Sequence, residues 1–184
     1  MKKLKVNNIS FIEYINLPDR SEYDYYLRYG DIQPVDRLNL GEFMDRSFGF
    51  IKEMQDLLNV TGLTWQTFFE QMESEVNRPK DELANIGLFH LQQTRLYCKE
   101  QIEFINKLER ENLSSGTNAE EEMAGIEEFA IFRSFPQYDK IIKEWGMKYE
   151  EVEKMPYSRA FVKLKYDKVY SEFSNRLSKI RAKK

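Results

Sequence analysis

Apolar residues recur every three or four positions along most of the chain, which is the spacing of one buried face of an α-helix. The clearest run extends from Leu40 to Leu58. Alternation of apolar and polar residues, the pattern of a half-buried strand, is weak and confined to residues 6–12, where a helix-capping signal competes with it. The pattern therefore predicts an all-α fold, built as an irregular multi-helix bundle.

Capping residues and helix breakers divide this pattern into separate helices. Ser10 opens a capping box, and its short helix should stop before Pro18. A second helix should start at Asp19 and run to Tyr29, with Gly30 as a left-handed stop residue. Further helix starts are predicted at Asn39, Thr64, Asn118, Ser134 and Tyr149.

Two helices should be long. One starts at 78–81 and carries an apolar line to Leu108; Gly87 inside it costs about 1 kcal/mol relative to Ala, but we expect one long central helix. The other is basic, starts at 155–156, where Pro suits a first helical turn, and ends near the C-terminus. Its apolar seam steps by four and three residues, through Tyr166, Tyr170, Phe173, Leu177 and Ile180. Such a narrow seam suits packing against one partner helix, so these aromatic side chains are expected to be buried.

The clearest linker lies just before the predicted helix start at Asn118, where the chain reads Leu-Ser-Ser-Gly-Thr-Asn. It divides the chain into an N-terminal helical region at 1–113, a linker at 114–118 and a C-terminal helical region at 119–184. A single continuous domain of 184 residues is the alternative.

The composition is that of a folded chain without disulfides. Hydrophobic residues make up 41% of the sequence and aromatic residues 14%, enough to supply a core. Cys98 is the only cysteine, which fits a reducing compartment. The charged N-terminal start has no apolar run behind it, so no secretory signal is expected, and no stretch approaches the roughly 20 apolar residues that a membrane span needs. We expect a cytoplasmic location and no membrane contact.

Charge is unevenly distributed, although the net charge is only −3. Residues 159–184 contain nine basic and two acidic residues, whereas residues 1–158 contain 19 basic and 29 acidic ones. A basic end on an acidic chain can fold back on that chain or reach an acidic partner.

Candidate chemistry is sparse. His90 is the only histidine, so a structural zinc site is essentially excluded. His90 and Cys98 lie eight residues apart and could form a nucleophile pair, but we favour both packing on the inner face of a helix. The acids of residues 121–128 could bind a divalent cation, but a solvated acidic face is favoured. Phosphate-binding glycine motifs are absent. We therefore expect no catalytic residue, no metal, no cofactor and no enzymatic activity.

Two surfaces could bind partners. The second helix carries tyrosines beside acidic residues and an arginine, a composition common at interfaces; the alternative is that Tyr26 and Tyr29 are core. The last helix interleaves cations with aromatic residues, which could hold nucleic acid through phosphates and stacking, although a solvated charged face is favoured. The predicted partner contacts are Tyr23, Tyr25, Arg28, Trp145, Tyr149, Lys163, Lys165, Lys168, Arg176 and Lys179.

The stretch from Phe135 to Tyr157 resembles small helical phage morphogenesis and virion proteins, tail-assembly chaperones among them. It reads as a helix ending in Trp145-Gly146, a short helix around Val152 and a start at Met155-Pro156. This resemblance implies a non-enzymatic assembly or virion protein of the host cytoplasm or the particle. Its partners would be phage structural or tail proteins, with homo-oligomers also expected. The alternative is a small nucleic-acid-binding or regulatory protein that uses the basic last helix.

Overall fold

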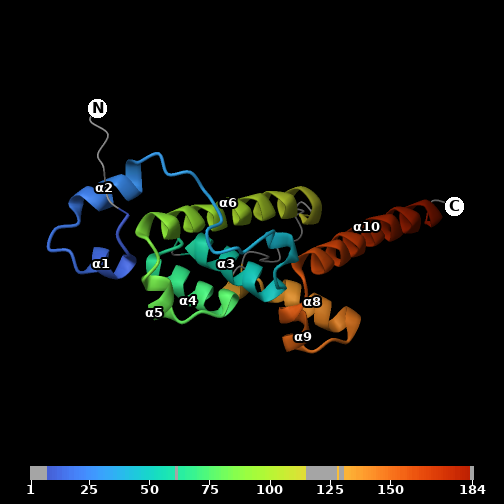
Figure 1. Cartoon of the computed structure of the whole chain (residues 1–184). Coiled ribbons are helices and arrows are strands. Elements are labelled where there is room, and N and C mark those ends of the chain that lie inside the picture. Colours follow the sequence, from blue (N-terminus) through green and yellow to red (C-terminus); the bar gives the residue numbers. More distant parts are fainter. Residues whose placement is uncertain (1–7, 61, 115–127, 129–130, 183–184) are drawn as a thin grey trace. The chain divides into compact units, whose positions relative to one another are not determined.

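A computed structural model describes residues 8–60, 62–114, 128 and 131–182 (Figure 1). Over these ranges the regular elements are helices, and no β-strand is present among them, so the all-α prediction is confirmed. The elements are α1 (Phe11–Ile15), α2 (Ser21–Tyr29), the 3-10 helix η1 (Phe43–Asp45), α3 (Phe48–Val60), α4 (Trp65–Val76), α5 (Lys80–Ala84), α6 (Leu88–Leu113), α8 (Phe135–Trp145), α9 (Tyr149–Lys154) and α10 (Tyr157–Arg181). The predicted long central and basic C-terminal helices are α6 and α10.

Several predicted caps form as expected. At α1, the Ser10 hydroxyl accepts a hydrogen bond from the Glu13 backbone at 3.2 Å, and the Glu13 carboxylate accepts one from the Ser10 backbone at 2.7 Å. These bonds hold the pKa of Glu13 below its usual value. Thr64 caps α4 by accepting from the Thr67 backbone at 3.2 Å. At the end of α8, Gly146 adopts the left-handed conformation with φ 63°, which stops that helix.

Gly30 ends α2 by a different mechanism from the one predicted. Its φ is −69°, so it is extended and not left-handed. A Cβ at this position would lie 2.5 Å from the Tyr26 carbonyl oxygen, so the close approach to the preceding turn requires glycine. The start of α2 is also later than predicted, because the Asp19 carboxylate accepts from the Ser21 backbone at 2.8 Å before the helix begins.

The predicted helix start at Asn39 was wrong. Asn39 and Gly41 have positive φ angles of 59° and 69°, which an α-helix cannot contain. Leu40 is nevertheless buried, in a non-helical segment. The α-helix begins only at Phe48, whose backbone N–H donates to the Met155 carbonyl at 2.7 Å.

The long helix predicted from 78–81 is broken into α5 and α6. Between them the chain pairs with the segment before α1: Leu88 N–H donates to the Ile9 carbonyl at 2.6 Å, and Phe11 N–H donates to the Ile86 carbonyl at 3.3 Å. These long-range bonds take the backbone groups that a continuous helix would use internally, so the helix stops and restarts.

The described chain forms two compact units, each assembled from segments far apart in sequence. Unit 1 comprises residues 1–41 and 57–102, and unit 2 comprises residues 42–56 and 103–184. They do not correspond to the regions 1–113 and 119–184, because helices pack on partners distant in sequence. That boundary stays a prediction, since its linker, apart from Ser114, and the helix predicted at Asn118 lie outside the described residues.

Each unit has its own apolar core. The core of unit 1 includes Tyr14, Leu63, Phe68, Phe69, Met72, Leu83, Leu88, Leu91, Cys98 and Ile102. The core of unit 2 includes Phe43, Phe48, Phe50, Ile51, Met54, Ile105, Tyr138, Ile141, Val152, Met155, Tyr157, Ala160, Phe161 and Leu164. Both sets follow helical spacing, so these positions satisfy the apolar periodicity seen in the sequence.

Candidate functional site

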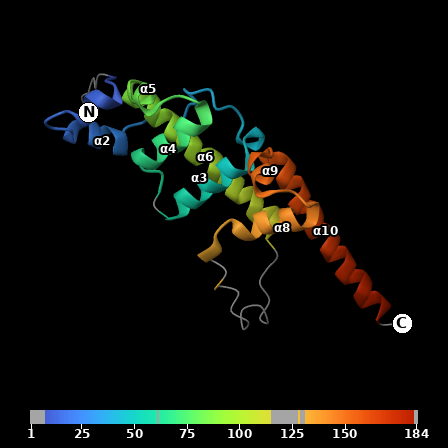
Figure 2. The ribbon, with the colours of Figure 1, turned by 90° about the horizontal axis from the view of Figure 1, so that it is seen from below.

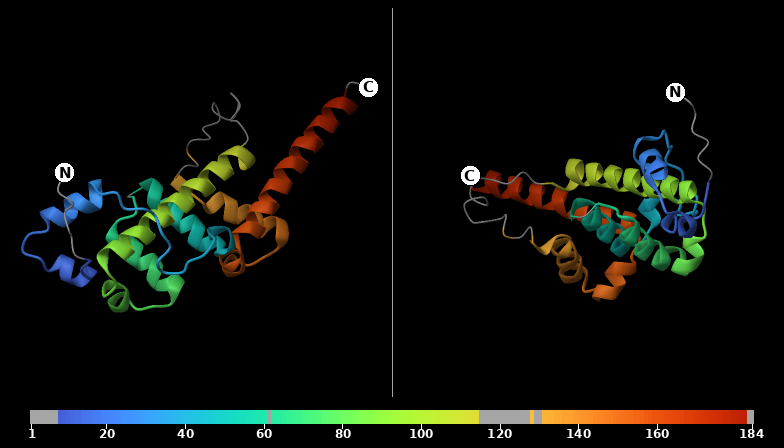
Figure 3. Two further views of the ribbon diagram at one scale, coloured as in Figure 1. Left: turned by 45° about the horizontal axis from the view of Figure 1, so that its top comes forward. Right: turned by 90° about the vertical axis from the view of Figure 1, so that its left-hand side faces the viewer.

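The N-terminal third of α10 is anchored in the core of unit 2. Tyr157, Ala160, Phe161 and Leu164 are buried there. The Tyr157 ring stacks on Phe48 with centroids 6.1 Å apart, and its backbone N–H donates to the Arg46 carbonyl at 2.8 Å. Beyond this anchor α10 continues as one helix to Arg181, projecting past α8 and α9 of the same unit (Figures 2 and 3).

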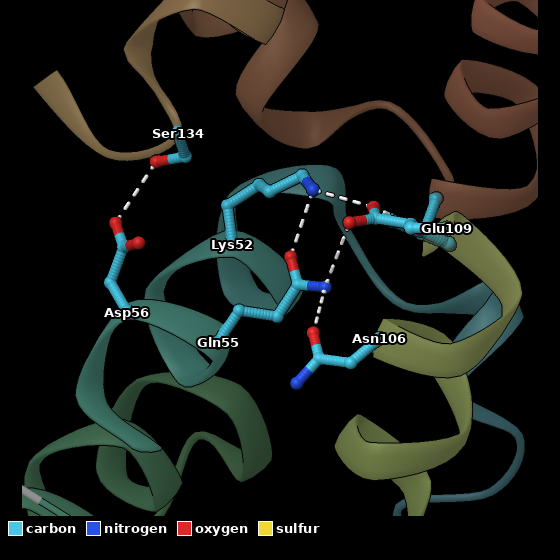
Figure 4. Close-up of polar contacts among 7 residues, drawn as sticks. Lys52, Gln55, Asp56, Asn106, Glu109 and Ser134 are labelled. Carbon is cyan, nitrogen blue, oxygen red and sulfur yellow. Dashed lines mark hydrogen bonds and ion pairs between the residues drawn. The ribbon is translucent and has the colours of Figure 1, made fainter. Parts of the chain in front are cut away.

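A buried polar network fixes this anchor (Figure 4). Lys52 is only 2% exposed. Its ammonium donates to Gln55 Oε1 at 2.8 Å and forms an ion pair with Glu109 Oε1 at 2.6 Å. Gln55 Nε2 donates to Asn106 Oδ1 at 2.7 Å, and the Tyr157 hydroxyl donates to Glu109. The network therefore connects α3, α6 and the first residue of α10 within unit 2.

The polar groups of this network satisfy one another. Burial lowers the pKa of Lys52, and the charge of Glu109 opposes that shift. Burial and Glu109 together raise the pKa of Tyr157, so its hydroxyl stays a donor. With its charges paired and its amides hydrogen-bonded, this cluster is a structural anchor. Sequence reasoning missed it; the only available signal was Lys52 interrupting the apolar face of α3.

The junction of α8 and α10 forms a cationic–aromatic surface. Arg159 and Lys163 lie over the Trp145 ring, at 5.5 and 5.6 Å from its centroid. Lys163 also bonds to Asp167 and pairs with Glu144 at 3.4 Å, and the bond to Asp167 raises the pKa of Lys163. An open pocket of about 520 Å³ lies here, lined by Trp145, Ser158, Arg159, Val162, Lys163 and Tyr166. The predicted contacts Trp145 and Lys163 thus meet at one site.

The seam of α10 beyond the anchor is exposed, whereas the sequence pattern predicted that it is buried. Tyr166 is 62% exposed and Phe173 is 52% exposed, and the rings of Tyr166 and Tyr170 stack with centroids 6.1 Å apart. The exposed apolar side chains, called here the α10 face, are Val162, Tyr166, Val169, Tyr170, Phe173 and Ile180. Five of them are separated by three, four or seven residues, and Val169 adjoins Tyr170, so all six lie on one side of the helix. The prediction failed because heptad spacing shows only that a helix face is suited to burial. It does not show that another segment of the same chain packs on that face.

The cations of α10 differ in the hydrogen bonds and ion pairs that they form. Lys168 donates to the Ser114 carbonyl at 2.7 Å and pairs with Glu172 at 3.8 Å. Lys165, Arg176 and Lys179 are exposed and form no ion pair with any described residue. Of the five cationic contacts predicted on α10, three are therefore available for a partner.

Tyr149 does not belong to the α10 face. Its ring stacks on Tyr138 with centroids 4.9 Å apart and planes 17° apart. It is still 44% exposed. Its main role is therefore to hold α9 against α8 within unit 2.

The patch predicted on α2 lies in unit 1. Tyr25 is 59% exposed and packs on Tyr29 at 5.0 Å, and Arg28 lies 5.9 Å from the Tyr29 ring centroid. Tyr23 is partly buried against Tyr14 and Phe89. The alternative that Tyr29 is core was wrong, because it is 65% exposed.

The residues considered for catalysis are not arranged for it. Cys98 is fully buried, and burial raises the pKa of its thiol well above the usual value. His90, which was expected on the inner face, is exposed. Within the described ranges, no group of three or more His, Cys, Asp or Glu side chains could hold a metal ion. The acids at 121–127 lie outside these ranges.

None of the helices described for this chain combines the length and the apolar character that crossing a bilayer requires. Comparison with protein-family models, with curated proteins and with solved structures finds no match to this chain.

Proposed function

We propose that this chain is a non-enzymatic assembly protein that binds a helix of a protein partner on the α10 face. The observation that carries the proposal is the row of exposed apolar side chains on α10, three of which are aromatic. Contiguous exposed apolar surface of this kind costs free energy in water and marks interaction sites. Its helical spacing suits the groove of a second helix.

The charges that flank the α10 face favour an acidic partner helix over a second copy of α10. In a parallel, in-register pair of copies, Arg176 would face Arg181 of the other copy across the seam, with like charges opposed. A partner helix with acidic residues beside its apolar face would instead pair with Arg176 and Arg181, which lie beside the seam.

The setting that we propose is phage morphogenesis, as a tail or virion assembly component. Its support is the resemblance of residues 135–157 to such proteins. In this chain the same stretch forms α8, α9 and the entry to α10. Those elements hold the anchored end of the helix that carries the α10 face. Phage structural or tail proteins are therefore the partners to look for.

Nucleic-acid binding by α10 is the second candidate. One specific observation favours it: Tyr166 and Tyr170, expected to be buried, are exposed and could stack on bases. Against it, Lys163 and Lys168 are engaged with carboxylates. That engagement reduces the number of phosphates the helix could contact.

Site-specific photocrosslinking in the native cell tests the proposal. A photoreactive phenylalanine analogue at Tyr170, on the α10 face, should give a discrete protein adduct. The same analogue at the exposed Asn175, on another side of α10, is the matched control and should give at least tenfold less. Adding Phe173→Glu to the Tyr170 probe should abolish the adduct, because a carboxylate would be placed in the apolar contact.

Three results would contradict the proposal: no adduct at Tyr170, equal adducts at both positions, or an adduct to nucleic acid. An adduct between two copies of the chain would replace the acidic partner with a homo-oligomer. If the nucleic-acid alternative holds, changing Lys165, Arg176 and Lys179 to Glu should weaken binding of a fluorescent oligonucleotide at least tenfold and flatten its salt dependence.

A further inference from the structure

Unit 1 contains a pocket that is independent of the α10 face and of the function proposed for it. Its volume is about 640 Å³, within the range of roughly 300–1,000 Å³ typical of small-molecule sites. Side chains from α2, α4 and α6 line it, together with Tyr14 of α1. The groups that matter for its chemistry are Asp24, Tyr25, Arg28, Trp65, Gln92 and Arg95.

Arg95 is a cation without a counter-charge. Its guanidinium stacks on the Trp65 ring at 4.7 Å from the centroid, and among the described residues no carboxylate pairs with it. It is partly buried, and this burial lowers its pKa. A stacked guanidinium keeps its N–H edge free, in the planar geometry that matches a phosphate or a carboxylate. An oxyanion in the pocket would therefore replace the solvation that Arg95 loses.

Gln92 forms part of the pocket wall. It is 4% exposed, and its Nε2 donates to the Leu27 carbonyl at 3.3 Å. That bond orients the amide, because the carbonyl needs a donor, and it joins α6 to α2, which both line the pocket. Gln92 Oε1 is closed off from solvent and has no hydrogen-bond donor among the described residues, so it is not available to a ligand in the open pocket.

The mouth of the pocket supplies flat surfaces and a second cation. Tyr25 and Tyr29 are more than half exposed, and Arg28 lies beside Tyr29. Asp24 is the one carboxylate in the lining, and it accepts a hydrogen bond from the Tyr14 hydroxyl. Two arginines against one carboxylate leave the pocket with a net positive charge, which favours an anionic ligand.

We propose that this pocket binds a nucleoside monophosphate, with its phosphate on Arg95 and Arg28 and its base against the pocket's aromatic rings. A nucleotide combines the two features that the pocket requires: a planar ring, and an oxyanion whose two negative charges match the two arginines. An aromatic carboxylate has the ring but only one charge, so the experiment distinguishes these sources.

Isothermal titration of the full-length chain tests this inference. The probes are AMP, GMP, adenosine, inorganic phosphate and indole-3-acetate, an aromatic carboxylate. We expect AMP or GMP to bind saturably, and at least tenfold more tightly than any of the other three. Arg28→Ala should weaken that binding at least fivefold; Arg28 is exposed, so this variant should fold normally. Arg95→Met should weaken it at least tenfold, with stacking on Trp65 partly retained.

Lys80→Ala is the matched control, because it removes an exposed cation of unit 1 that is not part of the pocket lining. Binding by this variant should be unchanged. The inference is overturned if neither nucleotide binds below millimolar concentration, if phosphate or indole-3-acetate binds as tightly, or if Arg28→Ala binds like the unmodified chain. The pocket contains no residue of α10. A negative titration result would therefore not contradict the partner-binding proposal, and a negative crosslinking result would not contradict the nucleotide proposal.

Discussion

At the scale of single residues, buried polar side chains are the feature that sequence reasoning could not place. Tyr14, Lys52 and Tyr157 are buried with polar partners. The sequence pattern assigned no polar partner to any of the three. For Lys52 and Tyr157 the carboxylate partner comes from an element far away in the chain. Tyr157 and Glu109, for example, are 48 residues apart.

Tyr14 gives a prediction with a definite pH dependence. Burial, with the hydrogen bond to Asp24, raises its pKa from 10.0 to about 12. Because the folded pKa lies above the unfolded one, the stabilisation by the protonated hydroxyl is complete below pH 10 and is lost as the pH rises toward 12. We expect Tyr14→Phe to lower the free energy of unfolding by about 1–2 kcal/mol at pH 8.

The difference between Tyr14→Phe and the unmodified chain should shrink steadily from pH 10 to pH 11.5. Urea unfolding followed by circular dichroism at each pH measures it. A difference that is constant with pH would show that the hydroxyl is not held as described. The exposed Tyr25→Phe, treated identically, should show no such dependence.

At the scale of elements, local signals were sufficient where helix ends are set by neighbouring residues. Thr64, Gly146 and the stretch 149–154 behave as predicted, because caps and left-handed stops involve residues within one or two turns. The failures at Asn39 and at 85–87 share another cause. There, positive φ angles or backbone bonds to a distant segment displaced the helix that the apolar spacing indicated.

The contact of α3 with α9 in unit 2 gives a prediction at this scale. Gly49 lies inside α3, where Ala would ordinarily be favoured by about 1 kcal/mol. A Cβ there would lie 2.5 Å from Glu153 Cγ and 3.1 Å from the Glu153 carbonyl oxygen. We therefore expect Gly49→Ala to destabilise the chain by about 1–3 kcal/mol, the range for overpacking, as measured by chemical denaturation.

A stabilising effect of Gly49→Ala would mean that α9 does not approach α3 this closely. Exposed helical positions provide the comparison. Ser178→Ala in α10 should be neutral or slightly stabilising, because Ser178 is exposed and Ala is the better helix former.

At the scale of the whole molecule, the chain divides into two units whose segments are interleaved in sequence. Each of the long helices α3 and α6 contributes residues to both units. We therefore expect these helices to couple the two units, so that a substitution that destabilises one unit also makes the other unit open more often. The single thiol, Cys98, is fully buried in unit 1 and so reports the opening of that unit.

Lys52→Ala in unit 2 should accelerate thiol labelling of Cys98 in unit 1. The substitution leaves the partly buried carboxylate of Glu109 without its cation, which costs up to about 3–5 kcal/mol. We expect the labelling rate, followed with a chromogenic disulfide reagent, to rise at least tenfold. Lys179→Ala, on the exposed part of α10, should leave the rate unchanged. An unchanged rate in Lys52→Ala would show that the units open independently.

The sequence by itself determined most of the helices, several of their caps and the presence of a basic C-terminal helix with an apolar seam, because these depend on residues one or two turns apart. The tertiary structure alone decided which faces are covered. Phe161 and Tyr170 both lie on α10 and both carry aromatic rings, yet the first is buried and the second is exposed. Burial depends on which distant segments pack against a given face, and the spacing of residues along one helix does not identify those segments.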